Sequence, residues 1–360
     1  MSVEAYYPKI LKRKNIDEKD FKDLIMDINL EIGRFDGILK YNPQKEIVKA
    51  FLRAEEVLSA SWLEVREIEF GEYLNKLLDR SFESEDIVIM KRLIDNYDDL
   101  LNHPEKEFSL DYLNKFHEYI YNNRASLQIP KSRKERHRQT WLINHKEELD
   151  ILRLYQFENE SKTKLLMDNL NQYINSSKFH PYITIAIAYA QIAMINPWYY
   201  ANNRTIGALI PSLFEYYGFT NQKVFFINSA LRKCKDEFFE QLYQLLINGT
   251  WNQWIEFFLN VVKEQAISYQ KKTDWIVKHY DFLEKKILAV KFSDRLTDYL
   301  DIMLAHPIFS RSEINKKYNL ANSLLNPYIN YMLAAGFLDK DCRKSRNNCF
   351  FTGIYAIMEL

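Results

Sequence analysis

The sequence is poor in the residues that break regular structure, with only eight glycines and nine prolines among 360 residues. Sandwiches and barrels need many glycine- and proline-containing turns, so this scarcity counts against an all-β fold and favours helices joined by short turns. No apolar run reaches the ~18 residues that a membrane-spanning helix needs, and the N-terminus lacks a signal-peptide pattern. We therefore expect a mainly α-helical, cytoplasmic protein with no membrane partner.

A net charge is also absent, because 49 basic residues balance 49 acidic ones. A neutral total provides no global attraction for nucleic acid, so any such contact would need a local basic patch. The three cysteines, Cys234, Cys342 and Cys349, lack metal-ligand spacing. Cys342 and Cys349 could face each other across a hairpin, but free thiols are the favoured interpretation in a reducing cytosol. No metal site is predicted.

Apolar residues recur at helical spacing along most of the chain. They predict helices near 21–32, 47–58, 89–101, 181–195, 205–217, 222–247, 251–268 and 271–289. The pattern breaks between about 123 and 146, where a polar, basic segment predicts an exposed loop or hairpin. We divide the chain into an N-terminal helical region, a core, a helical linker and a C-terminal domain, with bounds at 1–110, 111–268, 269–298 and 299–360.

The last sixty residues have the pattern of a winged helix-turn-helix domain. A short helix over Ser312–Tyr318 precedes a second helix near 322–335, and two apolar pairs then bracket a basic turn. The second helix has no Lys or Arg and contains Pro327, which is poor material for reading a major groove. A structural or oligomerising role therefore stays open beside DNA binding, for which the phosphate-contact candidates are Arg343, Lys344 and Arg346.

A polar turn between two apolar helices, from Asn196 to Gly207, is the strongest candidate site. Asn202, Asn203 and Arg204 place two amides and a cation at the start of a helix, where backbone N–H groups are unpaired. Such a position can bind an anion, and Arg204 could hold a phosphate with two hydrogen bonds. The simpler interpretation is a helix cap with a solvated arginine.

The motifs around this turn resemble those of the Fic family. The loop Asn-Pro-Trp-Tyr-Tyr-Ala-Asn-Asn-Arg at 196–204 is similar to the family's His-Pro-Phe-x-Asp-Gly-Asn-Gly-Arg. Residues 136–142 resemble the family's Arg-x-x-Gln-x-Trp-Ile stretch, and 251–259 are similar to its Trp-x-x-Trp-Ile-x-Phe-Phe-Leu helix. Residues 59–65 look like a worn copy of its Ser-Ser-x-Ile-Glu-Gly inhibitory motif, with Glu64 in place of the glutamate.

The resemblance implies a Fic-type helical bundle with a small β-hairpin flap, followed by the winged helix. It also implies a protein adenylyltransferase, which uses ATP with Mg²⁺ to transfer AMP to a Ser, Thr or Tyr hydroxyl. A target protein would then dock on the flap at Arg136, Gln139 and Trp141, while the nucleotide would bind at Asn202, Asn203 and Arg204. Asn196 stands at the position of the family's catalytic histidine.

Departures from the family pattern count against this activity. Asn196 cannot act as a base, because a side-chain amide does not titrate near neutral pH, and loss of a general base typically costs ~10²–10⁴-fold in rate. Tyr200 replaces an acidic Mg²⁺ ligand, and Ala201 replaces a glycine that lets the backbone approach a phosphate. Gly207 stands where a second arginine is expected, so Glu64 has also lost its usual partner.

Three interpretations remain open at this stage. The first is a catalytically impaired Fic protein that is retained as a nucleotide- or protein-binding module. The second is a weak or altered transferase, since asparagine can still hold a hydroxyl by a hydrogen bond. The third is a DNA-binding transcriptional regulator that acts through the winged helix. The target and the oligomeric state do not follow from the sequence.

Overall fold

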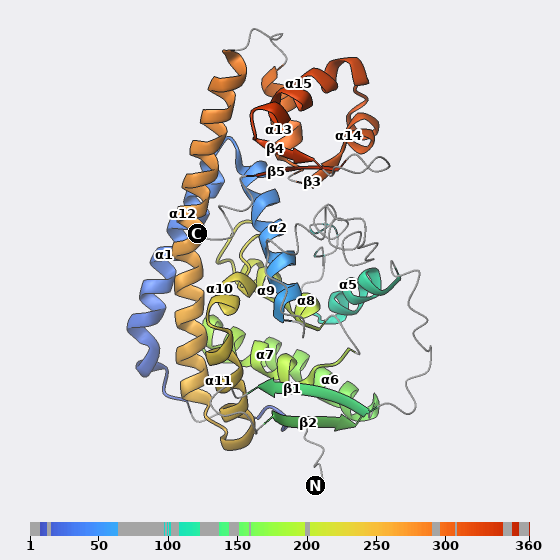
Figure 1. Ribbon diagram of the computed structural model, residues 1–360. Coiled ribbons are helices and arrows are strands. Elements are labelled where there is room, and N and C mark those ends of the chain that lie inside the picture. Colours follow the sequence, from blue (N-terminus) through green and yellow to red (C-terminus); the bar gives the residue numbers. More distant parts are fainter. Residues whose placement is uncertain are drawn as a thin grey trace. The chain divides into compact units, whose positions relative to one another are not determined.

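The computed structural model describes residues 8–12, 16–63, 97, 99, 101, 108–122, 137–143, 151–157, 160–198, 202–289, 296–306, 308–340, 348–352 and 360. These residues fall into two compact units, whose helices and strands are labelled in Figure 1. The first unit takes its residues from 1–33, 59–65 and 98–266. The second takes its residues from 34–58, 66–97 and 267–360.

The first unit is built from helices around one central apolar helix. Helix α7 (Pro181–Ile195) packs against helices α6 (Glu160–Ser176), α8 (Asn202–Gly207), α9 (Leu209–Tyr216) and α11 (Lys235–Asn248). Every residue of α7 from 182 to 192 is buried, as expected for a helix that is apolar all round. The predicted mainly α-helical fold is confirmed. The unit also contains α5 (Asp111–Asn122), α10 (Asn228–Lys233), the 3-10 helix η1 (Glu18–Phe21) and the first parts of α1 (Lys22–Tyr41) and α12 (Trp251–Leu288).

Both ends of α7 agree with the sequence prediction. His180 caps the N-terminus, where its Nδ1 accepts a hydrogen bond of 3.3 Å from the backbone N–H of Tyr182. Pro181 occupies the first turn, where its missing N–H costs nothing. The helix ends at Ile195, so the apolar run and its two boundary signals were sufficient to predict it.

The polar segment between α5 and α6 contains an antiparallel pair of strands. Strand β1 (His137–Ile143) pairs with β2 (Ile151–Phe157), from His137 opposite Phe157 to Ile143 opposite Ile151. Strand β1 lies beside α11. Gln139 and Trp141 belong to β1, whereas Arg136 lies outside the described residues. Docking of a target protein at this hairpin stays a prediction.

The second unit combines helices with a small antiparallel sheet. Among the described residues, its helices are the second part of α1, most of α2 (Lys45–Leu63), the second part of α12, α13 (Leu296–Leu304), α14 (Arg311–Tyr318) and α15 (Asn322–Ala334). Its strands β3 (Ile308–Ser310), β4 (Leu338–Lys340) and β5 (Asn348–Phe351) lie in the order β3-β5-β4. Helix α14 packs against α15 and β3, and α15 packs against β4.

Helix α15 carries its proline internally, as the sequence predicted. Arg311 at the start of α14 donates hydrogen bonds to Oδ1 of Asn326 (3.1 Å) and of Asn330 (3.2 Å), so two amides of α15 are used within the unit. The DNA-contact candidates Arg343, Lys344 and Arg346 lie outside the described residues. The winged-helix assignment and DNA binding therefore stay predictions.

Several predicted helix bounds are wrong, and α1 and α2 run further than the ranges 21–32 and 47–58. The helix expected at 205–217 is two helices, because the chain makes a tight turn at Ala208, whose N–H bonds to the carbonyl of Thr205 at 3.2 Å. The helix expected at 222–247 begins only at Asn228, since the apolar run at 224–227 is buried in non-helical form, and it is divided into α10 and α11 at Cys234. The helices expected at 251–268 and 271–289 are one helix, α12, because no glycine or proline interrupts them.

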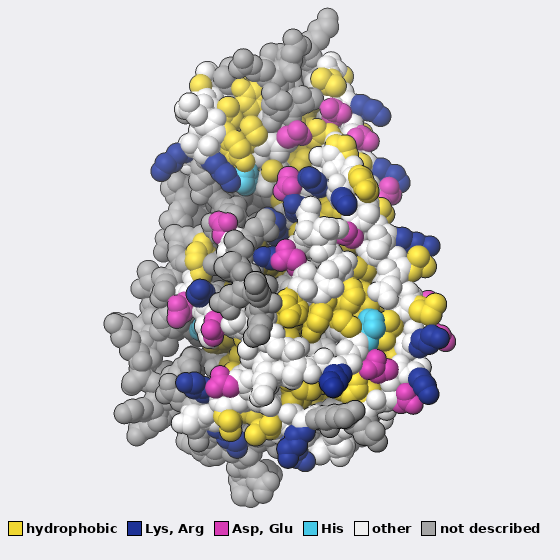
Figure 2. Space-filling model, turned by 180° about the vertical axis from the view of Figure 1, so that it is seen from behind, with side chains coloured by type: hydrophobic (Ala, Val, Ile, Leu, Met, Phe, Trp, Pro, Cys, Tyr) yellow, Lys and Arg dark blue, Asp and Glu magenta, His cyan; other side chains and the backbone are white. Residues whose placement is uncertain are grey.

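Charged side chains of both signs share the surface. On the face drawn in Figure 2, Lys and Arg side chains are intermixed with Asp and Glu side chains rather than gathered by sign. In the part of the chain that is described, no helix is both long and apolar enough to cross a bilayer. Cys234 is a free thiol, as predicted.

Candidate functional site

The candidate loop begins where Asn196 ends α7. Asn196 adopts a left-handed conformation, with φ 49° and ψ 60°, and its N–H bonds to the carbonyl of Ile192 at 2.9 Å. Among residues with a side chain, asparagine enters this conformation most readily, because its short amide can bond locally. The asparagine at this position therefore has a structural reason that is independent of catalysis.

Substitution of Asn196 tests this capping role. Asn196→Ala is expected to lower the free energy of unfolding by about 1 kcal/mol, because alanine enters the left-handed region at a cost of roughly 1–2 kcal/mol. Asn196→Gly is expected to be neutral or slightly stabilising, since glycine has no Cβ to clash. Urea unfolding followed by far-UV circular dichroism measures both. Equal effects of the two variants would contradict a capping role.

Asn202 closes the loop by gripping the backbone of Trp198. Its Oδ1 accepts a hydrogen bond from the Trp198 N–H at 3.0 Å, and its Nδ2 donates to the Trp198 carbonyl at 2.7 Å. The Asn202 side chain is buried, with 7% of its surface exposed. The oxygen and the nitrogen of this amide therefore both bond to the Trp198 backbone, as the carbonyl and N–H of another backbone residue would.

Loss of this amide is expected to unlock the loop. Asn202→Ala should lower the free energy of unfolding by about 2–3 kcal/mol, because it leaves a buried N–H and a buried C=O of Trp198 without their partner. Asn260→Ala is a matched control, since the Asn260 amide also bonds a backbone carbonyl but on an exposed face of α12. The control should cost less than about 0.5 kcal/mol. Chemical denaturation measures the free energy of unfolding of both variants. Equal losses in the two variants would contradict the role of Asn202 in holding the loop.

Trp198 joins the loop to α5. Its indole Nε1 donates to Asn114 Oδ1 at 3.2 Å, and its ring stacks on His117 with centroids 5.5 Å apart and planes 20° apart. Trp198 is buried, with 3% exposed, and His117 is buried too. The sequence does not predict a role for Asn114, whose only signal is its position three residues before His117, on the same face of α5.

The short helix after the loop is buried. Arg204 has 8% of its surface exposed and Thr205 has 0%, whereas Asn203 is half-buried. The interpretation of Arg204 as a solvated arginine is therefore wrong. Nucleotide binding by these residues stays a prediction, because no ligand contact tests it.

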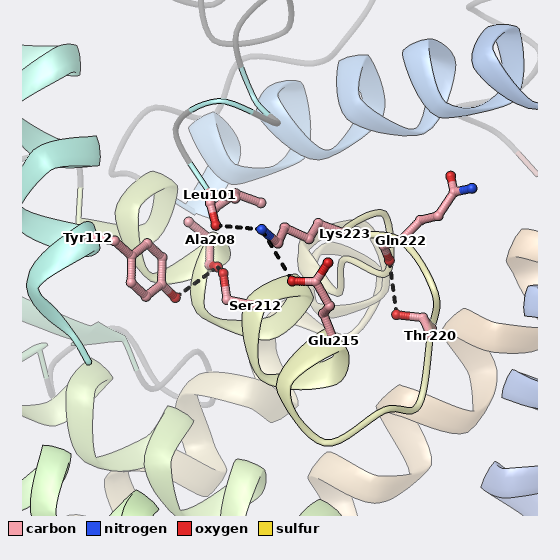
Figure 3. A network of polar contacts seen from close by, with 8 residues as sticks. All are labelled: Leu101, Tyr112, Ala208, Ser212, Glu215, Thr220, Gln222 and Lys223. Atoms are coloured by element: carbon pink, nitrogen blue, oxygen red, sulfur yellow. Dashed lines mark hydrogen bonds and ion pairs between the residues drawn. The ribbon is translucent and has the colours of Figure 1, made fainter. Parts of the chain in front are cut away.

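A polar network fixes α8 and α9 from outside the loop (Figure 3). The Ala208 carbonyl accepts hydrogen bonds from Tyr112 Oη at 3.2 Å and from Ser212 Oγ at 3.1 Å. Burial raises the pKa of Tyr112 above its ordinary value, so this phenol remains a neutral donor. Lys223 Nζ donates to the Leu101 carbonyl at 2.9 Å and lies 3.2 Å from Glu215 Oε2. The network anchors the two helices that follow the loop.

Several predicted site residues cannot be compared with the structure. Tyr200, Ala201 and Glu64 lie outside the described residues, as does Arg136.

His180 caps the opposite end of α7 from the loop, and burial lowers its pKa, which keeps the ring neutral near pH 7. Among the described residues, no group of three or more His, Cys, Asp or Glu side chains is placed to hold a metal ion.

Comparison with solved structures supports the fold. A Fic family protein from Desulfovibrio desulfuricans G20 matches with a TM-score of 0.55 and 12% sequence identity, over 97% of this chain and 99% of that one. A Fic domain containing signaling protein from Bacteroides thetaiotaomicron VPI-5482 matches with a TM-score of 0.49 and 13% identity, over 69% of this chain and 98% of that one. At such identities the first similarity establishes the fold alone. No curated protein matches the chain.

Comparison with family models identifies the region that holds the loop. Residues 107–213 match the model of the Fic/DOC family. This stretch contains α5, the β1–β2 hairpin, and the helices from α6 to α8, together with the loop between α7 and α8. The resemblance to the Fic family is therefore confirmed for this region, since residues 107–213 match the Fic/DOC family model.

Proposed function

We propose that the chain is a Fic-fold protein that has lost AMP transfer and is retained as a binding module. The observation that carries the proposal is Asn196, whose amide stands at the position of the family base and whose backbone caps α7 in the left-handed conformation. An amide has no lone pair that titrates near neutral pH, so it cannot take the proton of a target hydroxyl. Selection for a helix cap accounts for this residue without catalysis.

Among the described residues beside the loop, Tyr112 and His117 are the titratable side chains considered as a substitute base, and neither is placed to act as one. The Tyr112 hydroxyl donates a hydrogen bond to the Ala208 carbonyl. Burial raises the pKa of Tyr112, so the hydroxyl stays protonated at neutral pH. His117 is buried against the indole of Trp198. Both side chains act on the shape of the loop and not on a hydroxyl at its surface.

The described residues fit ATP with Mg²⁺ poorly. The Asn202 amide uses its oxygen and its nitrogen on the Trp198 backbone, so it would have to leave that contact to bind a phosphate. Arg204 presents little surface, with 8% exposed, to a triphosphate. These inward side chains count against a nucleotide ligand at this loop.

An AMP-transfer assay tests the proposal. The purified chain, incubated with α-labelled ATP, Mg²⁺ and cell lysate, is expected to label no protein above a heat-inactivated control. Asn196→His is expected to stay inactive, because Tyr200 and Gly207 still lack the metal ligand and the second arginine. An active Fic protein with an intact histidine motif serves as the positive control.

The contrary outcomes of this assay are distinct. Labelling by the wild-type chain that Arg204→Ala abolishes would overturn the proposal in favour of a weak transferase. Calorimetry with ATP, ADP and AMP, with and without Mg²⁺, separates the two kinds of binding module. We expect no binding heat, and Mg²⁺-dependent binding of any of the three would assign the module to a nucleotide.

A further inference from the structure

A short non-helical segment at residues 8–12 is held against α6 and α7 through its backbone. The Leu11 N–H donates to Asn169 Oδ1 at 2.7 Å, and Asn169 Nδ2 donates to the Leu11 carbonyl at 3.2 Å. Gln191 Nε2 donates to the Lys9 carbonyl at 2.9 Å. Two side-chain amides on two helices therefore recognise three backbone groups of the segment.

Two side chains of the segment are buried and three are exposed. Pro8 and Leu11 are buried, with Leu11 5% exposed, whereas Lys9, Ile10 and Lys12 are exposed. Because backbone contacts do not depend on side-chain identity, only the two buried positions select the sequence that fits. The pattern that this surface accepts is Pro-x-x-Leu.

Gln191 is a buried amide whose hydrogen-bond partner belongs to the segment. Its side chain is 1% exposed on α7, a helix whose other buried residues are apolar apart from Thr184. A buried amide costs free energy unless it is hydrogen-bonded, and the partner that the structure gives Gln191 is the Lys9 carbonyl. The amide is explained by the presence of a peptide carbonyl at this place.

Side-chain amides of helix α6 also hydrogen-bond the backbone of another segment. Asn175 Oδ1 accepts from the Phe108 N–H at 3.0 Å, and Asn175 Nδ2 donates to the Phe108 carbonyl at 2.7 Å. Asn171 Oδ1 accepts from the Leu110 N–H at 3.0 Å. A row of asparagines along α6 thus grips non-helical chain by its backbone at two separate places.

We propose that Asn169 on α6 and Gln191 on α7 form a peptide-binding site for a Pro-x-x-Leu segment, which residues 8–12 occupy within the same chain. Three hydrogen bonds and one buried leucine hold the segment, while α6 and α7 pack against each other without it. Contacts of this extent permit local release without unfolding of the unit. The vacated site binds the same sequence from a second copy of the chain. This inference does not depend on the proposed function.

A peptide-binding experiment on the full chain tests the inference. The variant Leu11→Asp ejects its own segment, because an aspartate cannot be buried in the leucine position. A fluorescein-labelled peptide of residues 6–17 is expected to bind this variant, as measured by fluorescence polarisation. The wild-type chain should bind it at least about tenfold more weakly, since a tethered segment competes at an effective concentration near the millimolar range.

Matched variants assign the binding to the two amides. In the Leu11→Asp background, Asn169→Ala should weaken the peptide by about tenfold or more, because it removes both bonds to the Leu11 backbone. Asn171→Ala should leave the affinity unchanged, since Asn171 holds the other segment. A peptide with the same Leu-to-Asp change should not bind. No binding of the wild-type peptide to a folded Leu11→Asp chain, or equal binding of both peptides, would overturn the inference.

Hydrogen exchange of the wild-type chain decides the question if Leu11→Asp does not fold. The Leu11 amide is expected to exchange at least about tenfold faster than the Ile187 amide of α7, through an opening that low urea concentrations do not accelerate. Equal protection of the two amides would show that the segment is released only when the unit unfolds, which would reject an exchangeable ligand.

Discussion

Lys272→Met is expected to lower the free energy of unfolding of the second unit by about 3–5 kcal/mol. Lys272 on α12 and Glu55 on α2 form an ion pair whose side chains are 0% and 2% exposed. The Lys272 ammonium also lies 5.8 Å from the centre of the Tyr269 ring. Removal of the lysine leaves a buried carboxylate without its counter-charge, which is among the most costly single changes in a protein.

Two further variants separate this cause from a general effect of charge removal. Lys278→Met breaks a pair with Asp274 on the same helix, but there the side chains are 74% and 63% exposed. It should cost less than about 1 kcal/mol. The double variant Glu55→Gln/Lys272→Met should recover most of the loss, because it removes both charges together. Urea unfolding that shows equal losses for Lys272→Met and Lys278→Met would contradict the prediction.

This ion pair also shows what sequence patterns leave undetermined. Periodicity correctly assigned residues 55 and 272 to helices, because apolar neighbours recur at helical spacing around each of them. The pairing of two charges 217 positions apart has no such local signal. It depends on which helix faces pack together, so a charge on an otherwise apolar face could be noticed but its partner could not.

Local signals explain why α7 was predicted in full and α12 was not. Helix α7 has an apolar run, Pro181 at its start and Asn196-Pro197 at its end, and each of these marks is visible in the sequence. Helix α12 was divided because its apolar spacing weakens around residues 269–270. Tyr269 is nevertheless completely buried, with its ring 5.3 Å from Phe35, so tertiary packing carries the helix through.

The sequence placed the candidate loop between two helices, as the structure does, but it did not predict the contacts that the side chains of the loop make. The sequence offered Asn202 as a phosphate ligand or a helix cap, whereas the structure uses its amide to grip the Trp198 backbone. A contact between residues four apart inside a loop depends on backbone path, which no residue pattern specifies. The stacking of His117 on Trp198 could not be predicted either, because the two residues are 81 positions apart in the sequence.

Trp254→Ala is expected to lower the free energy of unfolding of the first unit by about 3–5 kcal/mol. The Trp254 ring is 0% exposed and lies beside the rings of Phe238, Phe257 and Phe258, so its removal leaves a large cavity. Its Nε1 also donates to the Ala186 carbonyl of α7 at 2.8 Å. Trp251→Ala, one turn earlier on α12 and only half-buried, is the matched control and should cost clearly less.

Trp254→Phe separates the two contributions of this residue. Phenylalanine keeps most of the buried ring but leaves the Ala186 carbonyl without the indole donor, so a loss of about 1–2 kcal/mol is expected. Because α7 ends at Asn196, looser packing of its middle should also raise hydrogen exchange at the Asn196 amide in Trp254→Ala more than in Trp254→Phe. Unchanged exchange at Asn196 in a destabilised Trp254→Ala chain would show that the loop is held by α5 and by Asn202, and that α7 contributes only its end.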